Sequence, residues 1–365
     1  ALEDNGFKGN YGIQDQIFGL KWIRKNIAAF GGDPDNITIF GESAGGMSVA
    51  ALVVSPETKG LYRRAIIESG PVQYFSKSAD YLQEIGLKAA AEVGCGDPAT
   101  AAECLRSIDA IELVNDLPAS LSLIADYEKS LNYFYEIAID GKLIPDSPIR
   151  MIRRGEFPTD VPLIIGSNTD EASFFTSGKK LETADDFLQE TEADRERLKK
   201  IFNMDLDREK LAKHYDFEEF GGVKPAYNAL MRDMGFTCPA RQIASEYSAK
   251  QPDVFLYVFA KAPDEKGILA DWGAFHGSEL AFVYGNFQFM GIRFSSKTNN
   301  VVSKKMMAYW TAFAHTGKPA VKGLPEWKPF NDANLNYMWL DRDIVLKSGY
   351  RKDACDYLDS ILENL

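Results

Sequence analysis

Ser43 stands at the centre of the run Gly41-Glu42-Ser43-Ala44-Gly45, which matches the pattern Gly-x-Ser-x-Gly. This pattern indicates a nucleophilic serine when it joins a strand to a helix, because the sharp turn then holds the hydroxyl clear of the sheet. A β-branched run, Ile37–Phe40, precedes it, and a helix-compatible run, Met47–Val54, follows it. We expect both glycines to relieve clashes in the turn and the N–H of Ala44 to stabilise an oxyanion. The alternative is an ordinary serine N-cap.

A serine hydroxyl needs a general base, and the chain has only three histidines. His214 falls in a charge-dense segment, and His315 falls at the end of a predicted helix, where histidine commonly has capping and dipole roles. His276 lies in a loop between two glycines, beside aromatic residues, and loops of this kind carry catalytic residues. The sequence therefore favours His276 as the base over a purely structural histidine.

The third group must be a carboxylate that orients the imidazole and stabilises its charged form. Asp170 and Glu171 follow directly after the predicted strand Val161–Ser167. Parallel α/β sheets place their sites at the carboxyl ends of strands. The order serine, acid, histidine is that of α/β hydrolases. Local reasoning does not separate Asp170 from Glu171.

The rest of the chain predicts strands that alternate with helices, beginning with an amphipathic helix over residues 12–30. Further strands are expected at Arg64–Ser69, Phe134–Ile139, Val254–Phe259, Tyr337–Leu340 and Ile344–Leu346, and helices at Tyr81–Val93, Val223–Tyr247 and Val301–His315. This alternation predicts an α/β fold with a mostly parallel central sheet flanked by helices. Without repeats or linkers, residues 1–365 are expected to form a single domain. The charged segment 179–213 is expected to be a solvated helical excursion rather than a flap over a pocket.

Composition limits the partners that the protein can have. The formal net charge of −12 disfavours nucleic acid and anionic lipid, and it is compatible with neutral or cationic small substrates. No run of about 18 apolar residues occurs, so no membrane span is predicted. The four cysteines form no C-x-x-C pair, and neither a metal site nor a cofactor is predicted. Four cysteines can form two disulfides in three different ways, or they can remain free thiols. The residues are Cys95, Cys104, Cys238 and Cys355.

Several longer runs make the chain resemble the type-B carboxylesterase family, which includes cholinesterases and bile-salt lipase. The runs are Gly9–Gln16, Phe30–Pro34, Thr38–Gly46, Ile139–Gly141, Gly166–Glu171 and His276–Leu280. The resemblance covers nearly the whole chain and implies an α/β-hydrolase fold that hydrolyses small carboxylic esters through a Ser-His-Glu triad without a cofactor. It implies that Glu171 is the acid, although Ala172 replaces the usual glycine after it.

The resemblance also bears on cysteines, pocket and location. It implies the pairings Cys95–Cys104 and Cys238–Cys355, and hence an oxidising, secretory route. The residues that it places near the substrate are Phe174, Phe175, Tyr133 and Leu131. Since the last two are not the paired phenylalanines of cholinesterases, we expect a general carboxylesterase. Asn36 begins a glycosylation sequon, although it also lies at a strand start.

Members of this family begin well before Ala1, so the resemblance implies an esterase that lacks its N-terminal part. The glycine-rich loop that supplies two oxyanion donors does not occur in the sequence, and each lost donor costs roughly 10²–10³ in rate. Residues 1–365 alone are thus expected to turn over little substrate, with Asp15 buried and unpaired and an open sheet edge. The alternatives are an inactive truncated product and a cholinesterase-like adhesion or partner-binding protein. Relatives of the latter kind commonly lack the nucleophile.

Overall fold

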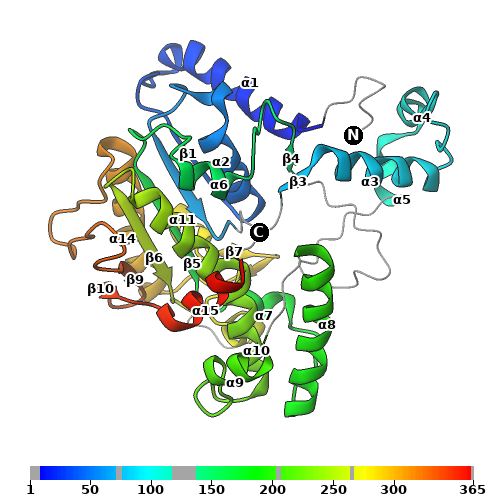
Figure 1. The fold of residues 1–365 in the computed structure, drawn as a ribbon. Coiled ribbons are helices and arrows are strands. Elements are labelled where there is room, and N and C mark those ends of the chain that lie inside the picture. Colours follow the sequence, from blue (N-terminus) through cyan, green and yellow to red (C-terminus); the bar gives the residue numbers. More distant parts are fainter. Residues whose placement is uncertain (1–8, 71–75, 117–136, 203–206, 264–266, 363–365) are drawn as a thin grey trace.

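The computed structural model describes residues 9–70, 76–116, 137–202, 207–263 and 267–362. At its centre lies a six-stranded sheet of order β1-β2-β5-β6-β9-β10 (Figure 1). Its strands are β1 (Thr38–Glu42), β2 (Arg64–Glu68), β5 (Leu163–Asn168), β6 (Val254–Phe259), β9 (Asn336–Leu340) and β10 (Val345–Ser348). The first five run parallel, and β10 pairs antiparallel with β9. The predicted α/β fold with a mostly parallel sheet is confirmed.

The central strands are apolar at nearly every position because the sheet is covered on both faces. Every residue of β5 and β6 is buried. Alternate residues of β5 enter opposite cores: Leu163 and Ile165 pack on one face, whereas Ile164 packs on the other. The first face is covered by α1 (Tyr11–Asn26), α2 (Ala44–Val54), α6 (Pro148–Arg154) and α11 (Cys238–Ser248). The second is covered by α12 (Ile268–Asp271), α13 (Leu280–Tyr284) and α14 (Lys297–Thr316).

A third core lies beside the sheet and corrects one expectation. It gathers α8 (Ala184–Phe202), α9 (Arg208–His214), α10 (Val223–Arg232) and α15 (Lys352–Leu362). The predicted helix Val223–Tyr247 is confirmed as one continuous helical segment, which consists of α10, a π-helical turn labelled η4 (Asp233–Thr237), and α11. The described part of the segment 179–213 is mostly helical, as expected, but it is not solvated throughout, because Phe187 and Leu211 anchor it in this core.

The remaining elements are small. The segment predicted as Phe134–Ile139 contributes β4 (Ile137–Ile139), which pairs with β3 (Ser76–Ser78) outside the central sheet, and its first three residues lie outside the described residues. Three helices, drawn in cyan in Figure 1, lie away from the sheet: α3 (Ala79–Glu92), α4 (Ala101–Ser107) and α5 (Ala110–Asp116). Short helices and a hairpin complete the list: η2 (Ile27–Phe30), η3 (Pro56–Thr58), α7 (Glu171–Phe175), β7 (Gln288–Phe289) and β8 (Ile292–Arg293).

Both implied disulfides are present, Cys95–Cys104 beside α4 and Cys238–Cys355 between α11 and α15. Asp15 is exposed rather than buried, because it lies on the solvent face of α1, opposite the buried Ile13 and Ile17. Within the part of the chain that the structure describes, none of the helices combines the length and apolarity that crossing a membrane requires.

Candidate active site

Ser43 occupies a sharp turn between the end of β1 and the start of α2. Its backbone has φ 55° and ψ −119°, a conformation that non-glycine residues rarely adopt, and its N–H donates to the carbonyl of Glu68 at 2.9 Å. A Cβ at Gly41 would lie 2.4 Å from the carbonyl of Gly45, so only glycine fits there. A Cβ at Gly45 would meet open space, so the expected constraint holds at Gly41 alone. The turn presents the hydroxyl beyond the sheet.

Ala44 is the first residue of α2, as expected for an oxyanion donor. The first N–H groups of a helix have no acceptor within the helix. The helix dipole also favours negative charge at this end. The geometry therefore suits an anion beside Ser43.

A chain of hydrogen bonds links Ser43, His276 and Glu171. The Oγ of Ser43 lies 2.8 Å from Nε2 of His276, and Nδ1 lies 2.6 Å from Oε2 of Glu171. Because a carboxylate can only accept, Nδ1 carries the proton, and Nε2 is free to accept from the serine hydroxyl. Asp170, the alternative acid, accepts instead from the N–H of Ala274 at 3.0 Å. Asp170 thus anchors the loop of His276 rather than contacting its ring.

Glu171 is itself held rigidly. It is completely buried, and its Oε1 accepts from the hydroxyl of Ser69 at 2.5 Å and from the N–H of Asn168 at 2.7 Å. These bonds satisfy one carboxylate oxygen and leave the other for His276. Such partners orient a functional carboxylate, because they remove its rotational freedom.

Three further carboxyl groups surround this chain: Glu42 is partly buried in the cavity wall, and Glu68 and Glu279 are completely buried. Oε1 of Glu42 is 3.2 Å from Nε2 of His276. Burial raises the pKa of Glu42 to about 7, although the charge of His276 acts to lower it. Burial likewise raises the pKa of Glu68 to about 7, although the Trp310 N–H donates to it at 2.6 Å. Burial also raises the pKa of Glu279 well above its usual value. These carboxyl groups hold protons more readily than exposed glutamates do.

His276 experiences opposing effects. Burial alone would lower the pKa of its imidazole, but the charge and hydrogen bond of Glu171, with the charge of Glu42, outweigh burial. The net result is a raised pKa. A proton that reaches Nε2 lies between Ser43 and Glu42, so the site accommodates the charged imidazolium.

A cavity of about 440 Å³ opens on Ser43 and His276. Phe174 lines it, as predicted, whereas Phe175 packs on the ring of His276. Leu131 and Tyr133 lie outside the described residues. Pocket residues that the sequence reasoning missed are Glu42, Leu280, Tyr284, Phe289 and Phe294. The concentration of aromatic residues after His276 was the available signal for the last three.

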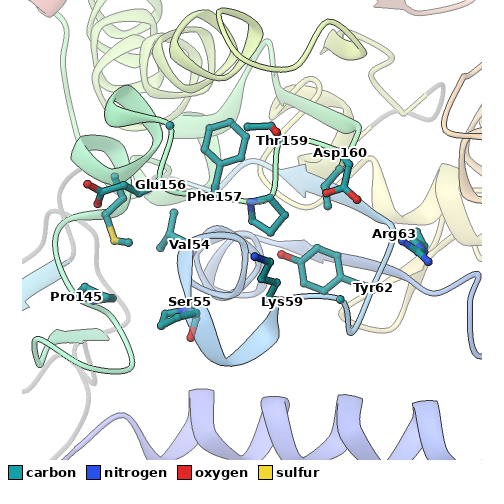
Figure 2. A pocket seen from close by; sticks show the side chains of 16 residues that line it. Val54, Ser55, Lys59, Tyr62, Arg63, Pro145, Glu156, Phe157, Thr159 and Asp160 are labelled. Atoms are coloured by element: carbon teal, nitrogen blue, oxygen red, sulfur yellow. The ribbon is translucent and has the colours of Figure 1, made fainter.

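A second, larger pocket of about 600 Å³ lies between the connections that enter β2 and β5 (Figure 2). Lys59 and Tyr62 come from the first connection, and Phe157 and Asp160 face them from the second. This pocket is at the amino ends of the parallel strands, whereas Ser43 lies at the carboxyl end of β1. It is therefore separate from the candidate active site.

The parallel sheet and the strand–serine–helix turn at its carboxyl edge define an α/β-hydrolase fold. The chain belongs to the carboxylesterase family, whose sequence profile matches residues 1–358.

Among curated relatives, acetylcholinesterase of Leptinotarsa decemlineata is 30% identical, over 98% of this chain and 58% of the relative. The para-nitrobenzyl esterase of Bacillus subtilis (strain 168) is 31% identical, over 94% of this chain and 66% of the relative. Bile salt-activated lipase of Homo sapiens is also 31% identical, over 97% of this chain and 48% of the relative. The chain thus spans roughly half to two-thirds of the length of these relatives.

Proposed function

We propose that this chain carries the catalytic centre of a serine carboxylesterase, with Ser43 as nucleophile, His276 as general base and Glu171 as the orienting acid. The observation that carries the proposal is the hydrogen-bonded chain Ser43–His276–Glu171 opening into a cavity at the carboxyl edge of the sheet. The proposal is also supported by family membership and by relatives named for ester hydrolysis.

The geometry supports a two-step acyl transfer. The Oγ of Ser43 attacks the ester carbonyl carbon while Nε2 of His276 takes its proton, and the carbonyl oxygen becomes an oxyanion near the N–H of Ala44. The C–O bond to the alcohol then breaks, and Nε2 returns the proton to the leaving alkoxide. Water then attacks the acyl carbon while His276 takes one of its protons; the bond from the acyl carbon to Oγ breaks, Nε2 returns the proton to Oγ of Ser43, and the carboxylic acid leaves. Glu171, which accepts from Nδ1, orients and stabilises the imidazolium in both steps.

We propose small neutral carboxylic esters as the substrates of a general carboxylesterase. The cavity walls include Phe174, Leu280, Phe289 and Phe294, which suit apolar acyl or alcohol groups. The relatives include proteins named acylcarnitine hydrolase and cocaine esterase. The names of these relatives therefore refer to different esters. The two disulfides support synthesis through an oxidising, secretory compartment, where such bonds persist.

Substitution of Ser43 tests the proposal. The whole protein, rather than residues 1–365 alone, should hydrolyse short-chain aryl esters, and Ser43→Ala should abolish this activity, since no other group replaces the nucleophile. Ser48→Ala is the matched control, because Ser48 lies on the same helix and its hydroxyl donates to the carbonyl of Ala44 at 3.0 Å. Ser48→Ala should retain activity. Full hydrolysis by Ser43→Ala would contradict the assignment, and a folded parent protein without any hydrolysis would favour a binding protein.

A further inference from the structure

The imidazole of His276 lies against two phenylalanine rings. The ring centroid of Phe236 is 4.9 Å from that of His276 with an interplanar angle of 45°, and that of Phe175 is 5.1 Å away at 47°. The two phenylalanine rings are themselves nearly parallel, 6.4 Å apart at 8°. Phe175 ends α7, the short helix that begins with Glu171. Phe236 comes from a different part of the chain, so its position needs its own explanation.

Phe236 is carried by η4, the π-helical turn between α10 and α11. A π-helical turn inserts an extra residue into a helix, and such turns occur frequently at functional sites. Here the wider turn carries Phe236, which is only 4% exposed, against the His276 ring. A regular helix through these residues would rotate Phe236 to another direction, because each residue advances the helix by about 100°.

Both ends of η4 are attached to the carboxyl end of β5, which leads to Glu171. At the first end, Arg232 donates to the carbonyl of Thr169 at 3.1 Å. At the second end, the hydroxyl groups of Thr237 and Ser167 lie 2.9 Å apart. The turn that carries Phe236 is therefore tied to the strand that positions the acid.

Its opposite side is braced to the C-terminal part of the chain. The buried carboxylate of Asp233, the first residue of η4, accepts from Arg232 at 2.8 Å and from Arg351 at 2.7 Å. The hydroxyl of Tyr215 donates to it at 3.1 Å. One residue beyond the turn, Cys238 forms its disulfide with Cys355. These links fix the turn that carries Phe236 to the C-terminal part of the chain.

We propose that Phe236 is a positioning residue of the esterase site, which holds the imidazole of His276 between Ser43 and Glu171 through the braced π-helical turn. The inference rests on the proposed function for the role of His276 as base. It assigns a role in the site to η4, a segment that contains none of the three residues Ser43, His276 and Glu171.

An aromatic ring suits this role better than an aliphatic side chain of similar size. The phenylalanine ring restricts rotation of the imidazole and excludes water from the face of the imidazole. It also attracts the imidazole when the imidazole is protonated. The charged groups that contact His276 are Glu171 from α7 and Glu42 from β1. Because Phe236 is uncharged, its replacement changes ring contact without changing this charge set.

The test uses NMR titration and serine labelling in the whole protein. The chain has three histidines, so the His276 signal can be assigned with a His276→Asn variant. Phe236→Leu and Phe236→Met remove the aromatic ring, whereas Phe236→Tyr keeps an aromatic ring at this position. Met234→Leu is the matched control, because Met234 is buried in the same turn and packs in the third core.

In Phe236→Leu and Phe236→Met, the pKa of His276 should fall by about half a unit because the imidazolium loses the attraction of the ring. The rate of Ser43 labelling by a fluorophosphonate should fall by about tenfold or more. Phe236→Tyr and Met234→Leu should match the parent protein in both measurements.

Unchanged pKa and labelling rate in a folded non-aromatic variant would overturn the inference. So would equal effects from Met234→Leu, because these would show a general loosening of the turn. Absence of Ser43 labelling in the parent protein would instead contradict the proposed function. The histidine titration would still decide whether Phe236 contacts the imidazole as described.

Discussion

The two ends of the central sheet carry pockets of very different character. The pocket at the amino ends of β2 and β5 is the larger, at about 600 Å³ against about 440 Å³. Its charged side chains, Lys59, Arg63, Glu156 and Asp160, are exposed, and Glu156 pairs with the exposed Arg154 at 2.8 Å. At the carboxyl end, direct hydrogen bonds join Ser43 to His276 and His276 to the fully buried carboxylate of Glu171.

We infer from this difference that convergence of polar groups, rather than volume, distinguishes the candidate active site. Exposed charges are screened by water and fix no geometry. Buried groups lose water and must be satisfied by one another, so their positions and protonation are closely determined. This contrast predicts large effects from substitutions at the carboxyl end and small effects at the amino end.

The largest effect is expected at His276. Replacement by alanine removes the base, and loss of one member of a catalytic serine–histidine unit costs on the order of 10⁶ in kcat. Lys59→Met in the amino-end pocket should leave kcat and KM for an aryl ester unchanged. Comparable losses in both variants would mean that the larger pocket takes part in the reaction.

A somewhat smaller effect is expected for Glu171→Gln. The amide nearly preserves shape but no longer stabilises the imidazolium, and it favours the wrong tautomer, at a cost of about 10⁴ in kcat. Asp170→Asn should cost much less, because Asp170 contacts the N–H of Ala274 rather than the ring. The ratio of the two losses in steady-state assays measures how specific the acid is. A larger loss from Asp170→Asn would reverse the assignment.

The smallest of these effects concerns stability and its dependence on pH. Glu68 is fully buried, and burial raises its pKa from 4.5 to about 7, so the native state keeps a proton that the unfolded chain releases above pH 4.5. Its contribution to the free energy of unfolding is therefore full below pH 4.5 and declines as pH rises to about 7, by about 3 kcal/mol.

Glu68→Gln should flatten this decline, because the amide does not ionise and can still accept from Trp310. Urea unfolding between pH 4.5 and 7.5 measures the change. The control is Glu219→Gln, at an exposed position, which should keep the slope of the parent protein. An unaltered slope in Glu68→Gln would show that Glu68 is ionised in the native state.

Local patterns sufficed for the parallel sheet and for the elbow at Ser43, because both depend on near neighbours. Residues of β6 are apolar at consecutive positions, and the predicted bounds Val254–Phe259 match the structure. A strand was predicted at 134–139, but its pairing with β3 was not, since strand pairing depends on distant segments. The π-helical turn at Asp233–Thr237 was not predicted for a similar reason: partners such as Arg351 lie 118 residues away.

The candidate site was predictable where the residue types are scarce and less so where they are common. Three histidines left few choices of base, but the sequence alone could not choose between adjacent acids, and only the resemblance pointed to Glu171. Ser69 and Phe236 were not found, because a serine after a strand and a phenylalanine in an apolar segment are ordinary. Their roles become visible only when distances to Glu171 and His276 are known.

The most direct measurement is the search for an acyl-enzyme. The protein is mixed briefly with p-nitrophenyl acetate, quenched with acid and digested, and the peptides are analysed by mass spectrometry. We expect an acetyl group on Ser43 that is absent from Ser43→Ala and strongly reduced in His276→Ala. Rapid release of p-nitrophenol with the acetyl group on another residue, and none on Ser43, would contradict it.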